Sequence, residues 1–210
     1  NYLAYDDASA ERGYWVEALD NYKMAVKYGI RKPDTLQAIK LQVFPVYVDN
    51  SKATFSICVW KNFRLRGIYS DNDLIYKQSG LKITDLFPEY GVDTLNNFYY
   101  APIRQQYLLN GATFPLVVSD TIAIGLIIDK KQTLVLGYDR NNNRSQYNFF
   151  VDEVTKWTQS TNDGTVIINP VLGKALPGYL TPVKEIKSKN YEVKVYPNPA
   201  QNKFQIEIET

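Results

Sequence analysis

Acidic side chains near the start of the chain have the types and spacing of a cation site. Asp6, Asp7 and Glu11 place three carboxylates within six residues. Calcium in proteins takes roughly six to eight oxygen ligands, mainly from carboxylates, amides and carbonyls. We expect Asp139 or Asn141 to complete the shell from a neighbouring strand end, so the pattern predicts a structural Ca²⁺. The alternative is a solvated acidic loop whose carboxylates only cap turns.

A second oxygen-rich stretch is Asp139-x-Asn141-x-Asn143. Its spacing is that of the first half of an EF-hand calcium loop. The second half departs from that pattern, because Arg144 replaces the required glycine and Phe150 replaces the bidentate glutamate. A hairpin turn is the alternative, since asparagine tolerates left-handed backbone conformations.

Aromatic side chains are the main compositional excess, with 17 tyrosines and 9 phenylalanines. Exposed aromatic rings can stack on sugars or peptides. Trp157 lies between Lys156 and a polar run, so we predict that it is exposed and is the first contact for a ligand, with Tyr99 or Tyr100 next. The alternative is that these rings pack in the core of the domain.

The chain has no histidine and one cysteine, Cys58. Ser-His and Cys-His catalysis and the usual neutral-pH general base are therefore excluded. Cys58 lies in an apolar run and is expected to be buried. The formal net charge is only +2 and the basic residues are scattered, so the sequence has no basic patch of the kind that binds nucleic acid. No apolar run reaches the ~18 residues that a membrane helix needs, so no transmembrane segment is expected.

The elements that must position these residues are strands, because the apolar period is two almost throughout. Residues 22–28, 39–43 and 122–128 alternate in this way. Further strands are expected at 54–61, 74–78, 98–103, 113–118, 134–138, 147–151 and 165–170, and a weak helix at 84–90. Turn signals such as Asn110-Gly111 lie between them. About ten short strands predict an all-β fold, an antiparallel β-sandwich over residues 12–174.

A boundary is expected after this sandwich. Residues 1–176 form the predicted domain, 177–190 a Pro- and Lys-rich linker, and 191–210 a separate β segment. The last segment is too short to bury a core of its own. The first residue is Asn1 rather than methionine, so we expect a further segment upstream.

The last segment resembles the opening of a type IX secretion C-terminal sorting domain. It reads Tyr191-Glu-Val-Lys-Val-Tyr-Pro-Asn-Pro-Ala200, followed by Lys203-Phe-Gln-Ile-Glu-Ile208. Pro197 and Pro199 each fix φ and remove a backbone donor, so a strand has to stop there. The resemblance covers about 20 residues and implies that the family's remaining strands are missing. It implies partnership with the type IX secretion machinery and a secreted or surface-attached location.

A looser resemblance covers residues 1–174. The opening Ala4-Tyr-Asp-Asp-Ala-Ser-Ala-Glu-Arg-Gly-Tyr14 is similar to the start of uncharacterised, jelly-roll-like domains that precede such sorting segments. Phe55-Ser-Ile-Cys-Val-Trp60 and Thr165-Val-Ile-Ile-Asn-Pro-Val-Leu-Gly173 are also similar to them. Ala8 departs from the pattern, which more often has glycine, and a positive φ at this position would disfavour alanine.

Together these observations favour a non-catalytic binding or adhesion module that recognises a polysaccharide or a surface protein. Two other classes remain open. One is a structural spacer that presents an upstream domain. The other is a carboxylate-dependent glycoside hydrolase, for which the sequence singles out no pair of acidic residues.

Overall fold

The computed structural model describes residues 3–15, 22–45, 49–63, 73–89, 97–151 and 157–173, and the strand backbone of 192–196 and 205–209. The chain divides into two compact units, Asn1–Leu180 and Thr181–Thr210. The predicted linker at 177–190 lies outside the described residues.

The strand β2 (Tyr22–Gln42) organises the first unit, because its two halves belong to different parts of the sheet. The first half pairs with β7 (Val117–Ile128) and β9 (Asn148–Val151). The second half pairs with β6 (Phe98–Pro102) and β12 (Ile168–Leu172). The register with β7 is interrupted between Ile30 and Asp34, a stretch that contains Pro33, which cannot donate a ladder hydrogen bond.

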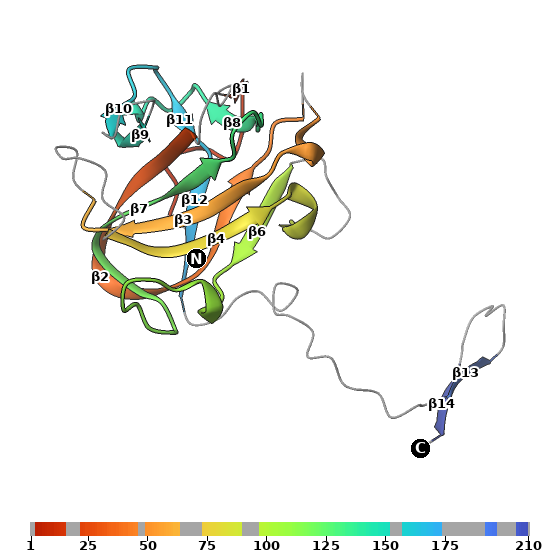
Figure 1. Cartoon of the computed structure of the whole chain (residues 1–210). Coiled ribbons are helices and arrows are strands. Elements are labelled where there is room, and N and C mark those ends of the chain that lie inside the picture. The colour runs from red at the N-terminus through yellow and green to blue at the C-terminus, as the bar shows by residue number, and fades with distance from the viewer. Residues whose placement is uncertain are drawn as a thin grey trace. The chain divides into compact units, whose positions relative to one another are not determined.

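The larger sheet has the order β10-β9-β2-β7-β3-β4. In it, β3 is Phe55–Lys61, β4 is Leu74–Leu81 and β10 is Thr158–Gln159. The short strand β5 (Phe87–Pro88) pairs with β6. In Figure 1, β7, β3 and β4 lie side by side, from green through orange to yellow.

A three-stranded sheet has the order β1-β8-β11. It consists of β1 (Arg12–Tyr14), β8 (Leu136–Asp139) and β11 (Thr165–Val166). Every pairing among the described strands is antiparallel. The prediction of an all-β, antiparallel sandwich is therefore confirmed.

The main core lies on one face of β2 and its neighbours. Its β2 residues Met24, Val26 and Tyr28 alternate with Lys23, Ala25 and Lys27 on the other face, as the two-residue period predicts. Gly125 of β7 allows a close approach of β2, because a Cβ there would lie 1.9 Å from the carbonyl oxygen of Met24. Cys58 is buried, which confirms its predicted place.

Several elements differ from the sequence-based expectation. The strands expected at 22–28 and 39–43 form one continuous strand, β2, and the short strands β1 and β10 were not expected. The strand expected at 113–118 begins only at Val117, because Pro115 interrupts the segment with a residue that has no backbone donor. The helix expected at 84–90 is instead a 3₁₀ turn, η3 (Ile83–Asp85), followed by β5. A helix cannot continue through Pro88, because proline has no backbone N–H and disfavours helical backbone at the preceding residue.

In the second unit, β13 (Glu192–Tyr196) pairs antiparallel with β14 (Gln205–Glu209). The register runs from Glu192 opposite Glu209 to Tyr196 opposite Gln205. The segment therefore contains one antiparallel pair of strands. Its Pro-rich turn lies outside the described residues.

Candidate functional site

Sheet pairing brings three of the predicted carboxylates together. Glu11 immediately precedes β1, Asp139 ends β8, and Arg12 of β1 lies opposite Tyr138 of β8. One carboxylate oxygen each from Asp7, Glu11 and Asp139 lies within 4.8 Å of the others. Asp7 and Asp139, which are 132 positions apart in sequence, therefore meet at one end of the small sheet.

Asp139 accepts several of the hydrogen bonds in this cluster. It is fully buried and its carboxylate accepts four hydrogen bonds. Two come to Oδ1 from the backbone N–H groups of Asn141 and Asn142, at 2.7 and 3.0 Å. Two come to Oδ2 from the N–H of Asp7, at 3.0 Å, and the amide of Asn142, at 2.8 Å. The carboxylate thus closes its own turn and ties the N-terminal segment to β8.

The exposed carboxylates of Asp7 and Glu11 share a donor. The Ser9 hydroxyl lies 2.6 Å from Asp7 Oδ1 and 2.8 Å from Glu11 Oε1, although it has one proton to donate. The Ser9 side chain and backbone N–H hold the pKa of Asp7 below its usual range. Asn141 donates its amide to Glu11 Oε1 at 2.8 Å, and Arg140 N–H donates to Oε2.

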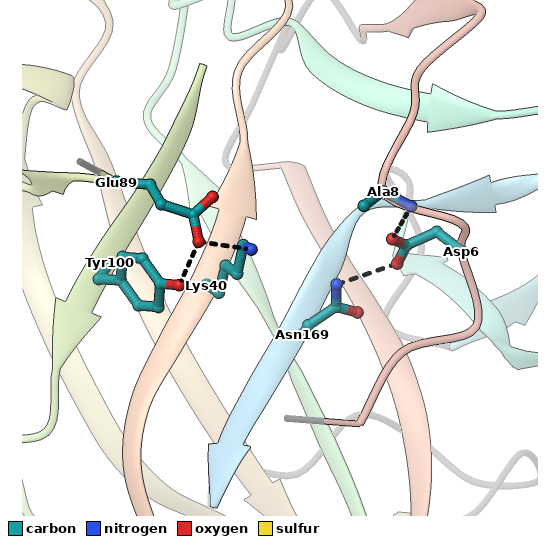
Figure 2. Close-up of polar contacts among 6 residues, drawn as sticks. All are labelled: Asp6, Ala8, Lys40, Glu89, Tyr100 and Asn169. Carbon is teal, nitrogen blue, oxygen red and sulfur yellow. Dashed lines mark hydrogen bonds and ion pairs between the residues drawn. The ribbon is translucent and has the colours of Figure 1, made fainter. Parts of the chain in front are cut away.

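Asp6 does not join the cluster. Its carboxylate accepts from the amide of Asn169 at 2.9 Å and from the N–H of Ala8 at 3.0 Å, as Figure 2 shows. Burial raises the pKa of Asp6, against these hydrogen bonds. Ala8 has φ 67°, so the position where glycine was expected does adopt the left-handed conformation.

The donor set of Asp7, Glu11 and Asp139 fits Ca²⁺ by chemistry, because all three offer hard carboxylate oxygens. In this loop most of those oxygens already accept hydrogen bonds from Ser9, Asn141 and the backbone. A bound ion would have to replace some of these bonds. The calcium site therefore stays a prediction, with Asp7, Glu11 and Asp139 as the residues that would hold it.

The aromatic residues predicted to contact a ligand are not exposed on the surface. Trp157 is only 8% exposed, so the prediction of an exposed ring is wrong. It packs edge-on against Trp60 at 5.2 Å and Phe63 at 5.0 Å between ring centroids. The reason is a second apolar cluster, in which small residues such as Ala25 and Ala123 on the far face of the sheet leave room for large rings.

The tyrosine pair is also largely enclosed. Tyr100 is buried, and its hydroxyl donates to Glu89 Oε1 at 2.6 Å. Tyr99 points to the opposite face of β6 and is partly buried against the main core. The prediction that this pair is an exposed platform is therefore wrong, because Phe87 and Val171 pack around Tyr100 and the main core lies against Tyr99.

Sequence reasoning missed a buried ion pair beside Tyr100. Lys40 Nζ lies 2.9 Å from Glu89 Oε1, and the two side chains are only 5% and 12% exposed. Lys40 Nζ also lies over the ring of Phe98, 4.1 Å from its centroid. Figure 2 shows Lys40 and Tyr100 converging on the same Glu89 oxygen. No sequence signal separates Lys40 from an ordinary solvent-facing lysine in an alternating strand.

The exposed apolar side chains are elsewhere. Phe114 is 53% exposed, Val117 is 56% exposed and Leu109 is also exposed, all within one short segment. Trp15 is 57% exposed beside β1. A pocket of about 260 Å³ adjoins the 109–117 segment, and Val117 is part of its wall.

Among the described residues, no helix is long and apolar enough to cross a membrane. No family model, curated protein or solved structure matches this chain.

Proposed function

We propose that this chain is a non-catalytic binding or adhesion module of an exported protein. The observation that carries the proposal is the segment 109–117, which exposes Leu109, Phe114 and Val117 next to a pocket. Scattered exposed apolar residues are ordinary, but three of them within nine residues beside a concave surface are typical of recognition sites. The segment follows β6 and leads into β7, and its Leu109 N–H donates to the carbonyl of Ile75 in β4.

The geometry of the acidic cluster argues against a carboxylate-dependent hydrolase. A glycosidase needs two carboxyl groups that can both reach the substrate. Asp139 is fully buried, and its carboxylate already accepts four hydrogen bonds. Such a carboxylate is suited to fixing a turn rather than attacking a substrate.

Export by the type IX route is proposed from the resemblance of residues 191–210. The antiparallel pair β13–β14 agrees with the strand pattern on which that resemblance depends. The test is fractionation of a bacterium that has this secretion system, comparing the parent strain with one that lacks the outer-membrane translocon. The protein should be found outside or on the surface of the parent and inside the mutant cells. Equal distribution in both strains would remove this route.

Binding is tested with an array of glycans and extracellular proteins, using the wild type, Phe114→Ser and Trp15→Ser. We expect hits with the wild type that Phe114→Ser weakens and Trp15→Ser leaves unchanged. Both side chains are exposed, so neither change should unfold the domain. Loss only with Trp15→Ser would move the site to β1. An array without hits would favour the structural spacer.

A further inference from the structure

The pocket beside segment 109–117 lies where the end of β3 meets the start of β7 and the turn that follows Asn110. Its lining comes from these three parts of the chain and from Ile75 of β4, and the pairing of Lys61 with Ile122 holds β3 against β7. Asn110 fixes the turn by donating its amide to the carbonyl of Leu74 at 2.7 Å. The pocket therefore combines strand residues with a turn that is hydrogen-bonded to β4.

The floor of the pocket belongs to the hydrophobic core. Ile75, Leu116, Val118 and Ile122 line it and are all buried. Because these side chains are packed on their other sides, the shape of the floor is set before a ligand arrives. A volume of about 260 Å³ is below the roughly 300–1,000 Å³ of pockets for drug-sized ligands, so a single ring is the fitting size.

The rim of the pocket is polar. Lys61, Asn62, Thr113 and Ser119 line it and are exposed. An amide and two hydroxyls can both donate and accept hydrogen bonds, which suits a ligand with several hydroxyl groups. Val117 adds an exposed apolar wall. A sugar ring has this combination of hydroxyl edges and apolar C–H faces.

The rim of the pocket carries a charged side chain, and a second charge lies next to it. Lys61 is the charged residue among the described residues that line the pocket. Asp120 follows the lining residue Ser119, whose hydroxyl lies 3.4 Å from its carboxylate, so one negative charge lies just outside. A carboxylate on the ligand would be attracted by Lys61 and repelled by Asp120, and these two effects can be measured separately.

We propose that this pocket binds a sugar residue that carries a carboxylate, a uronic acid, with Lys61 contacting the acid group and Asn62 the ring hydroxyls. The inference rests on the proposed binding function and assigns it a site and a ligand class. The apolar rim residue Val117 would face the ring, and the exposed Phe114 nearby would contact the next sugar of a chain.

The test is titration of the full chain with galacturonic acid, trigalacturonic acid and the methyl ester of the trimer, at low and high salt. The ester removes the charge and keeps the sugar. We expect the acids to bind more tightly than the ester at low salt, and the difference to shrink at high salt as the charges are screened. The trimer should exceed the monomer if Phe114 contacts a second residue.

Three variants and one control locate the site. Lys61→Met should weaken acid binding by about tenfold or more, the usual loss of one charge-assisted hydrogen bond, and leave the ester unchanged. Asp120→Asn should strengthen acid binding, and asparagine suits the φ of 57° at this position. Asn62→Gly should weaken the acids and the ester equally, without backbone strain at φ 51°. Lys131→Met, an exposed lysine outside the lining, should change nothing.

Equal binding of acid and ester, or equal effects of Lys61→Met and Lys131→Met, would overturn the assignment. If the array finds another ligand and no uronate binds, the pocket proposal fails while the binding module stands. If neither experiment finds a ligand, both proposals fail.

Discussion

At the scale of single residues, the N-terminal loop is held by a few side chains that satisfy backbone donors. Asp139 accepts four hydrogen bonds while fully buried, and Asp6 accepts from Ala8 and Asn169. Buried polar groups are costly unless they are paired, so these contacts fix the loop. The loop also contains a residue that is poorly suited to its backbone conformation, which makes the energetics testable.

Ala8→Gly should stabilise the protein. Ala8 has φ 67°, where an L-residue is disfavoured by about 1–2 kcal/mol. Glycine removes this cost from the folded state, but its greater freedom also stabilises the unfolded chain and offsets part of the gain. We expect a gain of about 0.5 kcal/mol in the free energy of unfolding, measured by urea denaturation. Gly80→Ala is the reverse substitution at a similar backbone conformation. Gly80 has φ 71° and open space around it, so the added methyl group meets no atom and only the strained backbone lowers the stability. If Ala8→Gly and Gly80→Ala both raised or both lowered the free energy of unfolding, this explanation would be contradicted.

Tyr138 should give a stability change at alkaline pH. Burial, with smaller contributions from Tyr14 and Asp163, raises the pKa of Tyr138 to about 12. The unfolded chain loses this proton near pH 10, so the stability that Tyr138 contributes is complete below pH 10 and is lost between about 10 and 12. Tyr138→Phe should cost about 1 kcal/mol at neutral pH, through the lost bond to the carbonyl of Asn162.

The check is chemical denaturation of wild type and Tyr138→Phe at pH 7, 9, 10 and 11. The advantage of the wild type should shrink above pH 10, because only the wild type carries this ionising group. An advantage that stayed constant to pH 11 would mean that Tyr138 titrates normally in the folded protein.

At the scale of elements, β2 decides the architecture because it belongs to both halves of the fold. Its first half lies between β7 and β9 and its second half between β6 and β12. From Ala38 to Gln42 the residues on both faces of β2 are buried, so a lysine in this stretch has to be paired. Lys40 meets this need with Glu89, and the register of β2 with β6 places Tyr100 directly opposite.

Removing one partner of this ion pair should be far more damaging than removing both. Lys40→Met leaves the Glu89 charge largely buried, and we expect a loss of about 3 kcal/mol in the free energy of unfolding. Lys40→Met with Glu89→Gln should recover most of that loss, because the glutamine oxygen still accepts from Tyr100. Thermal and urea denaturation of the two single variants and the double variant measures the coupling.

The control for this cycle is the exposed pair Lys52 and Asp49, whose atoms lie 3.5 Å apart. Lys52→Met should leave stability nearly unchanged, because water and salt screen an exposed pair. A double variant at Lys40 and Glu89 that is no better than the single variants would show that the charges themselves are required.

At the scale of the whole molecule, the first unit closes on itself through its N-terminal segment. Leu3 N–H donates to the carbonyl of Pro170, Asp6 contacts Asn169, and Asp7 contacts Asp139. Tyr5 stacks between Tyr28 and Tyr147, with centroid distances of 4.8 and 4.4 Å. The start of the domain is thereby fastened to strands from its end, so ion binding at the loop would act on the whole unit.

Chelation tests the calcium prediction at this scale. An ion held by Asp7, Glu11 and Asp139 would bind the folded state only and stabilise it by roughly 2.7 kcal/mol at a hundredfold excess over Kd. EGTA should then lower the melting temperature and added Ca²⁺ should restore it, while Glu11→Gln should abolish both responses. An unchanged melting temperature would leave the loop as a hydrogen-bonded turn without a metal.

The sequence by itself determined the fold class and most strand positions, because a two-residue apolar period has one physical solution, a sheet with a buried face. It also indicated a cation site at Asp7, Glu11 and Asp139, together with Asp6, which the structure leaves outside the cluster, and it indicated that alanine at position 8 would be disfavoured if its φ were positive. It did not determine which aromatic rings are exposed. Only the tertiary structure decided that Trp157 is enclosed and Phe114 is open, because exposure depends on what covers each face. The ion pair of Lys40 and the pocket at Lys61 were decided in the same way, since each is assembled from strands that are distant in sequence.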